Sequence, residues 1–338
     1  MLKVRELIIK HMRQVQSILI KSDETGLRID RWFKQHYPNI NHGYLQKLLR
    51  TGQVRVDGAR VKSGSRLEEG QYIRVPPIDA DINKKLKLSK IVIKPTISKS
   101  DAKKLKARIL HKDEDIIVIN KPSGLAVQGG SRLNNNLDDM LEALCFGEKE
   151  KPRLVHRLDK NTSGVLLLAR HSSAARALTK AFKNKEVQKI YWAVVVGVPS
   201  PEKGMIDLTL AKLPTFGGEK VMAGVADGKI AQTIYRTVDH AGGEASWVVF
   251  EPLTGRTHQI RVHAAALGTP ILGDGKYGQR KAFLKNDEIV NRLHLHARGI
   301  RFPHPAGQIM ETIAPIPDHI QRTFKVFGFD AIQEKKIF

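Results

Sequence analysis

The 338-residue chain contains a single cysteine and no long hydrophobic run. With one cysteine, Cys145, it forms neither an internal disulfide nor a zinc site built on cysteine pairs, as is usual in the reducing cytoplasm. Cys145 ends the stretch LDDMLEALC, which is typical of a helix core, and we favour that interpretation over a catalytic nucleophile. The longest apolar runs, such as GVLLLA and WAVVVGV, are far shorter than the roughly 20 residues that cross a bilayer, so we expect no membrane span.

Two other patterns are also absent. The N-terminal stretch MLKVRELIIKHMRQVQSILI lacks the continuous apolar core and small-residue cleavage site of a signal peptide, so we expect a cytoplasmic protein in which residues 1–14 are a short extension. The chain lacks the pattern G-x-x-x-x-G-K-[ST], the usual cradle for the phosphates of a bound nucleotide. The sequence therefore disfavours secretion and phosphoryl transfer from a nucleotide.

Acidic residues are outnumbered, since 57 Lys and Arg stand against 34 Asp and Glu, which gives a formal net charge of +23. Because Lys and Arg that neutralise phosphates release condensed counterions, this charge indicates a polyanionic partner, with nucleic acid as the first candidate. Residues 1–110 hold 25 basic and ten acidic residues, and residues 83–108 hold ten basic residues and one acid, Asp101. Such a basic stretch is typical of a linker rather than a packed element. The predicted organisation is a small domain at 15–76, a basic linker at 77–108 and a larger domain at 109–328.

The segment before the linker predicts two short helices and a β-hairpin. GLRIDRWFKQHY carries a helical apolar face that Pro38 ends. NHGYLQKLLRTG predicts a second helix, capped by Asn41 and stopped by Gly52. VRVDGARV predicts a hairpin that turns at Asp57 and Gly58.

Five basic side chains are spread over these elements, and we expect them to bind RNA: Lys47, Arg50, Arg55, Arg60 and Lys62. In its αα-β-hairpin order and its charge, the segment from about 26 to 76 resembles the S4 RNA-binding domain. The alternative is a basic helix-hairpin module of no particular specificity.

The segment after the linker predicts an α+β domain. DIIVIN, GVLLLAR and IYWAVVVGV are typical of strands, as are IAQTIYRTVD and EASWVVFEPL. SSAARALTKAFKN predicts an amphipathic helix capped by Ser172 or Ser173, and THQIRVHAAALG predicts a strand that turns into a helix. Many strands with few intervening helices indicate a mixed, largely antiparallel sheet, with helices around it and a central cleft.

Four stretches carry chemistry-bearing residues: NKPSGLAVQGG at 120–130, LVHRLDKNTSGVLLLAR at 154–170, KIYWAVV, and PLTGRTHQIRVH at 252–263. Each is weak alone. Together they resemble the catalytic domain of the pseudouridine synthases, in the branch that modifies large-subunit ribosomal RNA. The family signature H-R-L-D-x-x-T-S-G is complete at His156 to Gly164, and G-R-T-H-Q-I-R-x-H is complete at Gly255 to His263. With the S4-like segment, the resemblance covers nearly the whole chain.

The resemblance implies a role for each motif. Asp159 is the catalytic carboxylate, either as a nucleophile or as the base that takes a proton from the sugar. Arg261 is its ion partner, which keeps the carboxylate charged. Tyr191 lies against the flipped uracil, with Ile260 as the opposite apolar wall, and Arg157 fills the space that the target base leaves. Further substrate-binding candidates are His156, Lys121 and Arg256.

Other chemistries fit less well. His258 and His263, or His294 and His296, have no carboxylate or cysteine partner at a ligand spacing, so we expect structural or RNA-facing histidines and no metal. Glycoside hydrolysis needs paired carboxylic groups, and Glu251 is the only acid near the last motif.

The expected protein is therefore a monomeric, cytoplasmic RNA pseudouridine synthase that acts on 23S ribosomal RNA or its large-subunit precursor without cofactor or metal. The rival interpretation is a non-catalytic ribosome-binding or assembly protein with the same basic surfaces. Binding alone does not explain the set of Asp159, Tyr191 and Arg261, so the enzyme is favoured.

Overall fold

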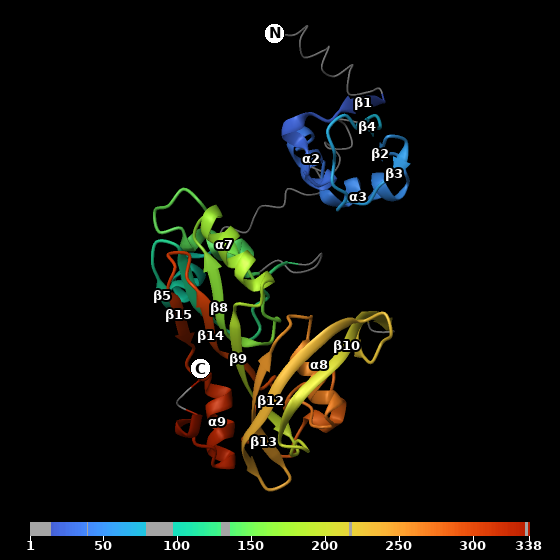
Figure 1. Cartoon of the computed structure of the whole chain (residues 1–338). Coiled ribbons are helices and arrows are strands. Elements are labelled where there is room, and N and C mark those ends of the chain that lie inside the picture. The colour runs from blue at the N-terminus through green and yellow to red at the C-terminus, as the bar shows by residue number, and fades with distance from the viewer. Residues whose placement is uncertain (1–14, 39, 79–96, 130–135, 216–217, 335–336) are drawn as a thin grey trace. The chain divides into compact units, whose positions relative to one another are not determined.

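The computed structural model describes residues 15–38, 40–78, 97–129, 136–215, 218–334 and 337–338 (Figure 1). The chain divides into two units, Met1–Ile93 and Lys94–Phe338. Within the described residues, no helix is long and apolar enough to cross a membrane.

The first unit packs two helices, α2 (Ile29–His36) and α3 (His42–Arg50), on a small antiparallel sheet. In sheet order its strands are β1 (Gln16–Leu19), β4 (Tyr72–Val75), β2 (Arg55–Val56) and β3 (Ala59–Arg60), and a short helix η1 (Ser22–Glu24) follows β1. The predicted cap is confirmed, because the Asn41 side chain accepts the Tyr44 N–H. The predicted hairpin turn is confirmed as well, since Asp57 and Gly58 have φ values of 47° and 77°.

The second unit is built on one eleven-stranded mixed sheet, which confirms the α+β prediction (Figure 1). Its order is β11-β10-β12-β13-β9-β14-β8-β6-β5, with β15 also paired to β14 and β7 to β8. The pair β14–β8 is parallel, and the other strand pairs of this sheet are antiparallel. The strands are β5 (Ile109–Lys112), β6 (Ile116–Lys121), β7 (Arg153–Leu154), β8 (Ser163–Ala169), β9 (Gln188–Val196), β10 (Lys203–Thr215), β11 (Gly218–Ala223), β12 (Lys229–Ala241), β13 (Ala245–Pro252), β14 (Leu295–Pro303) and β15 (Ile309–Ile313).

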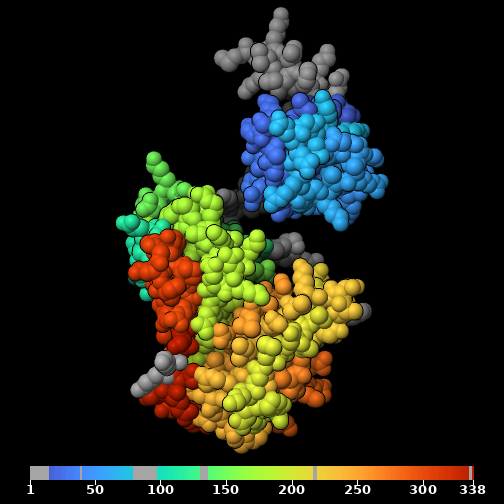
Figure 2. Space-filling model, viewed as in Figure 1, coloured from blue at the N-terminus to red at the C-terminus, as the bar shows by residue number. Residues whose placement is uncertain are grey.

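Helices cover both faces of this sheet around its middle strands. They are α5 (Lys99–Lys106), α6 (Leu137–Met140), η2 (Leu141–Leu144), α7 (Ser172–Lys183), α8 (Gln259–Ala266), η3 (Gln279–Ala282), α9 (Asp318–Phe327) and η4 (Ala331–Glu334). Alternate residues of β6 and β8 pack against α7 on one face and against α5 and η2 on the other. This double burial explains why these strands are continuous apolar runs rather than alternating patterns. By contrast, β10, β11 and β12 lie at the surface of this unit (yellow to orange in Figure 2).

Three predictions on element boundaries were wrong. Helix α7 is capped by His171, which accepts the Ala174 N–H, rather than by Ser172 or Ser173. Part of the predicted linker is helix α5, whose Leu105 is buried in the core with η2; the residues at 79–96 lie outside the described part of the chain. The larger unit also continues past residue 328, because Phe338 packs against the cluster around α9.

Gly164, the glycine of the H-R-L-D-x-x-T-S-G signature, lies opposite Ala297 where β8 pairs with β14. Its φ is +112°, and a Cβ there would lie 2.1 Å from the carbonyl oxygen of Ala297. We therefore expect Gly164→Ala to destabilise the protein by more than about 4 kcal/mol, seen as loss of soluble protein or a much lower Tm. Gly147→Ala is the matched control, since its φ is +89° with nothing within 4 Å. A Gly164→Ala protein that melts like the control would contradict this account of the close approach between Gly164 and Ala297.

Candidate active site

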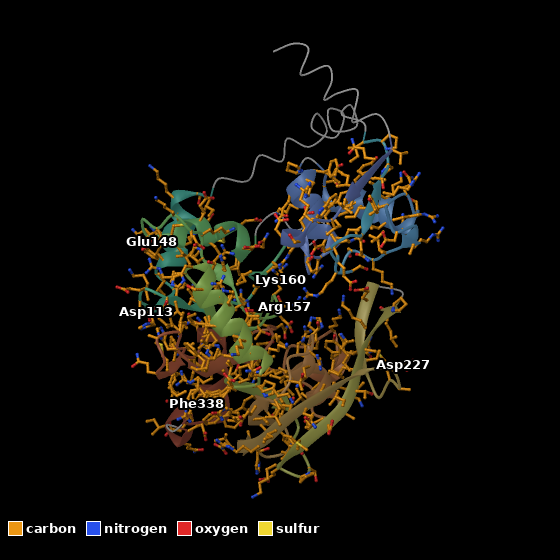
Figure 3. All side chains as sticks on the ribbon, turned by 45° about the horizontal axis from the view of Figure 1, so that its top comes forward. Asp113, Glu148, Arg157, Lys160, Asp227 and Phe338 are labelled. Atoms are coloured by element: carbon orange, nitrogen blue, oxygen red, sulfur yellow. The ribbon has the colours of Figure 1, made fainter. Side chains whose placement is uncertain are left out.

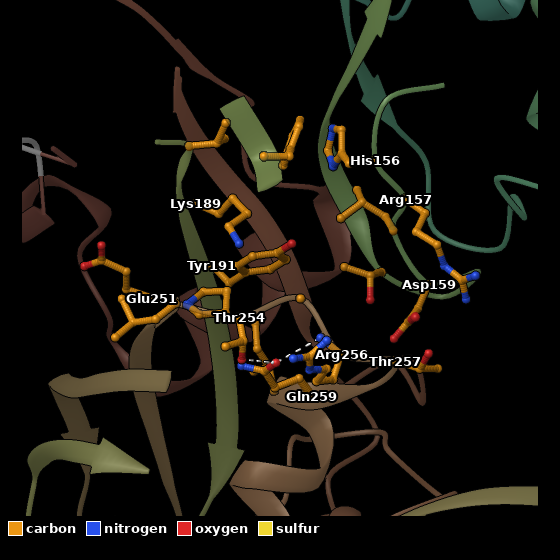
Figure 4. A pocket seen from close by; sticks show the side chains of 18 of the residues that line it. His156, Arg157, Asp159, Lys189, Tyr191, Glu251, Thr254, Arg256, Thr257 and Gln259 are labelled. Carbon is orange, nitrogen blue, oxygen red and sulfur yellow. Dashed lines mark hydrogen bonds between the residues drawn. The ribbon is translucent and has the colours of Figure 1, made fainter. Parts of the chain in front are cut away.

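A cleft of about 890 Å³ in the second unit gathers three of the four motif stretches (Figure 4). Its walls are the loop that precedes β8, the start of β9 with the end of α7, and the segment from Glu251 to Arg261. THQIRVHAAALG was predicted to run from strand into helix. Its strand part was wrong, because α8 starts at Gln259 and residues 253–258 form the connection from β13.

Asp159 lies in the loop between β7 and β8 and points into the cleft (Figure 4). The loop closes on itself through a hydrogen bond from the Thr162 N–H to the Asp159 carbonyl oxygen, at 3.1 Å. The first motif, NKPSGLAVQGG at 120–130, hydrogen-bonds to this loop. Ser123 Oγ donates to the Asn161 carbonyl at 2.8 Å, and the Gly124 N–H donates to the Lys160 carbonyl at 2.9 Å. The first motif thus supports the carboxylate-bearing loop.

Lys121 does not face the cleft, contrary to its prediction as a substrate-binding residue. It is fully buried, and its Nζ donates to the carbonyl oxygens of Pro122, Leu125 and Lys160 at 2.9–3.1 Å. Burial lowers the pKa of Lys121 to about 7, while the charge of Asp159 acts in the opposite direction. Lys121 therefore ties the first motif to the loop that carries Asp159.

His156 lines the cleft, and its ring is fixed by contacts with Leu167 and Phe182. Its Nε2 accepts the Leu167 N–H at 2.8 Å, and its ring stacks on Phe182. Burial, and then the charge of Lys189, lower the pKa of His156 to about 3, so the ring is neutral. Arg157, the next residue, is exposed at the cleft (Figure 4) and lies near Lys160 on the same loop (Figure 3).

Tyr191 stands on β9, the strand that pairs with both β13 and β14. It packs with Ile260 in one apolar cluster, and both residues line the cleft. Burial, with a smaller contribution from the charge of Asp159, raises the pKa of Tyr191 well above its ordinary value. The phenol is therefore protonated at neutral pH.

The direct partner of Arg261 is Asp274, not Asp159 as predicted. Arg261 Nε and Nη2 donate to the two Asp274 carboxylate oxygens at 2.8 and 2.7 Å. Burial by itself would lower the pKa of Arg261, but Asp274 and, less strongly, Asp159 raise it. Arg261 thus acts on Asp159 as a nearby fixed charge rather than through contact.

The side chain that comes closest to the Asp159 carboxylate as an ion partner is His258, which was considered above as a structural or RNA-facing residue. Its Nε2 lies 3.8 Å from Asp159 Oδ2. No spacing in the sequence indicates this contact, because it joins a loop and a turn about a hundred residues apart. Gln259, beside it, fixes the turn by accepting the Thr254 hydroxyl and the Arg256 N–H.

Two more basic side chains belong to the cleft. Arg256, a predicted substrate-binding residue, lines the cleft and is exposed, and its Nε donates to the Ile230 carbonyl at 3.0 Å. Lys189 was missed; its amine lies beside the Tyr191 ring (Figure 4). Burial lowers the pKa of Lys189, and the charge of Glu251 opposes that shift.

The basic residues predicted to bind RNA in the first unit separate into two groups. Lys47, Arg50 and Lys62 line one hollow of about 570 Å³ at α3. Arg55 instead braces the hairpin by donating to the carbonyls of Gly52 and Gly58, and Arg60 is exposed on β3.

The described residues contain no group of three or more His, Cys, Asp and Glu side chains arranged to hold a metal ion. In the cleft, the Asp159 carboxylate instead lies among a neutral histidine, a fixed guanidinium and a protonated tyrosine. Such a set can position a nucleophile or base next to a flat, polar ring and a phosphate chain.

The sequence profile of the RNA pseudouridylate synthase family matches residues 115–266. The chain is 37% identical to a ribosomal large subunit pseudouridine synthase C of Vibrio cholerae over 91% of its own length and 96% of the relative's length. It is 36% identical to the protein of that name from Escherichia coli K12, over 91% and 95%. Among solved structures, human RNA pseudouridylate synthase domain containing 4 is similar, with 29% identity and a TM-score of 0.56 over 67% of this chain and 95% of that one.

Proposed function

Because the chain belongs to the RNA pseudouridylate synthase family, and is thus an isomerase that converts uridine to pseudouridine in RNA, we propose that its substrate is large-subunit (23S) ribosomal RNA. The names of its relatives and its net charge of +23 support this choice. The observation that carries the proposal is the convergence of Asp159, Tyr191 and Arg261 on one cleft with a basic rim. Purified protein incubated with unmodified 23S RNA should form pseudouridine, and RNA that stays unmodified would contradict the proposal.

The reaction breaks the bond between uracil N1 and ribose C1′, turns the base and joins C5 to C1′. The proton on C5 is lost and N1 gains one, so the balance needs no external reagent. An ionised Asp159 can either add to the sugar or take a proton from it, and its place in the cleft is compatible with both. Arg261 leaves the oxygens of the Asp159 carboxylate free for the reaction, since its hydrogen bonds run to Asp274.

The other cleft residues suit a base taken out of its stack. Tyr191 and Ile260 offer apolar surface for a uracil ring, and the exposed Arg157 can occupy the space that the flipped base leaves. The tyrosine serves as a protonated ring and not as a base, because its pKa is raised.

We further propose that the first unit is an S4-type RNA-binding module and that the protein acts as a cytoplasmic monomer. The support for the RNA-binding module is the order of two helices and a hairpin and the hollow at α3, which is lined by Lys47, Arg50 and Lys62. Cations grouped along one helix and a neighbouring loop suit a phosphate backbone.

Removing residues 1–93 tests the module. This segment holds 19 Lys and Arg and nine Asp and Glu. We expect weaker RNA binding and a flatter dependence of affinity on salt, with each lost phosphate contact reducing the log-log slope by about 0.9 on duplex or about 0.7 on single strands. Filter binding at several salt concentrations measures the slope, and a thermal melt checks folding. An unchanged slope would mean that the second unit alone holds the RNA.

A further inference from the structure

Two side chains next to Asp159, His258 and Tyr277, have no role in the proposed function. His258 uses both ring nitrogens: Nε2 lies 3.8 Å from Asp159 Oδ2, and Nδ1 lies 2.5 Å from the Tyr277 hydroxyl oxygen. The two rings meet edge to face at 5.5 Å. The imidazole is thus held between a phenol and the carboxylate.

Tyr277 is also held by contacts that do not involve its hydroxyl group, from the buried ion pair of Asp274 and Arg261. Its N–H donates to Asp274 Oδ1 at 3.3 Å, and the Arg261 guanidinium lies 4.9 Å from the centre of its ring. Asp274 is 2% exposed and binds Arg261 through both oxygens. Removing the hydroxyl group alone should therefore leave the ring in place.

The backbone of His258 is also unusual. It is the N-cap residue of α8, with φ 55° and ψ 20°, in the left-handed region that residues other than glycine seldom adopt. Such a conformation persists where the surrounding structure determines it, and it is frequent at functional sites. Here it directs the imidazole toward Asp159.

The protonation of the ring follows from its neighbours. Burial lowers the pKa of His258, although Asp159 opposes that shift, so the ring is neutral at pH 7, with one donor and one acceptor nitrogen. Burial raises the pKa of Tyr277, which remains a donor. If the Tyr277 O–H donates to Nδ1, the remaining proton is on Nε2 and faces the carboxylate. The other tautomer would set an Nε2 lone pair against a negative charge.

We propose that Tyr277 and His258 are positioning residues for Asp159: Tyr277 fixes His258 as the Nε2–H tautomer, and that N–H orients the carboxylate for the reaction. The part that concerns the reaction rests on the proposed function, whereas the tautomer does not. The distance of 3.8 Å is that of the free protein, and hydrogen bonds in active sites often tighten when substrate binds.

The tautomer is measured directly by long-range ¹H–¹⁵N NMR of protein labelled with ¹⁵N-histidine, because the ring nitrogens of the two tautomers have different shifts. His258→Gln identifies the His258 signals among the 13 histidines. We expect the Nε2–H form in the parent protein and a shift toward the Nδ1–H form in Tyr277→Phe, with an unchanged Tm. A charged or Nδ1–H His258 in the parent protein, or the same tautomer in Tyr277→Phe, would overturn the proposal.

Kinetics test the link to Asp159. Tyr277→Phe should lower kcat about tenfold at constant KM, because an imidazole released from the Nε2–H tautomer no longer offers Asp159 an N–H, and a hydrogen bond to that charged group is lost. His258→Gln can still donate an N–H and should retain more activity than His258→Leu. Tyr235→Phe, which removes a hydroxyl that donates to the Pro201 carbonyl, is the control and should match the parent. Equal losses in the Gln and Leu variants would reduce His258 to a structural residue. If the parent protein forms no pseudouridine, the proposed function fails while the tautomer result still stands.

Discussion

Asp159→Asn is expected to form no detectable pseudouridine, with a rate at least about a thousandfold below that of the parent protein. The amide keeps the shape of the carboxylate but has no charge, so it can neither add to the ribose nor accept a proton effectively. Stability should change little, because Arg261 keeps both of its hydrogen bonds to Asp274. The measurement is tritium release from C5-labelled uridine in ribosomal RNA.

Binding separates a chemical from a structural role of Asp159. Affinity depends mainly on phosphate contacts, and loss of one negative charge favours a polyanion, so filter binding by Asp159→Asn should be as tight as by the parent protein. Asp227→Asn is the matched control, since Asp227 is an exposed carboxylate in the turn between β11 and β12 (Figure 3). A folded, RNA-binding Asp159→Asn protein that releases tritium at the parent rate would remove Asp159 from the mechanism. Loss of binding together with a lower Tm would make it structural.

Tyr191→Leu is expected to lower turnover roughly 10- to 100-fold, because stacking of a base on an aromatic ring contributes about 1–3 kcal/mol. Tyr191→Phe keeps the ring and should bind RNA like the parent protein. Comparing the two variants separates the contribution of the ring from that of the hydroxyl group. Single-turnover rates at saturating RNA, with a melt to check the core around Ile260, decide the matter. Normal turnover in the Leu variant would mean that the uracil does not lie against β9.

Local sequence patterns predicted the elements whose residues determine their own conformation. The apolar runs of β6 and β8, the Asn41 cap and the turn at Asp57 and Gly58 all occur as expected. Helix α5 was missed because its eight residues include four lysines and bury one leucine, so its sequence carries almost no apolar face. Its stability comes from tertiary contact with η2, which no local pattern contains.

In the site too, the sequence predicted which residues line the cleft but not which of them form pairs. The motifs brought Asp159, Tyr191 and Ile260 to the cleft, but they did not indicate which charges meet. Arg261 lies in the first turn of α8 and pairs with Asp274, which follows the helix. Which residue the arginine faces depends on where α8 begins, and that point is determined by three-dimensional packing. Lys121 was misjudged for a related reason, since a lysine in a motif looks like a phosphate ligand until its three carbonyl partners are seen.

The most direct test of the central claim is a map of pseudouridine in 23S ribosomal RNA from cells with the gene, without it, and without it but complemented by the Asp159→Asn form. The account predicts that specific pseudouridines disappear when the gene is removed, return with the parent gene and do not return with the Asn variant. Identical maps in all strains, or full restoration by the Asn variant, would contradict it.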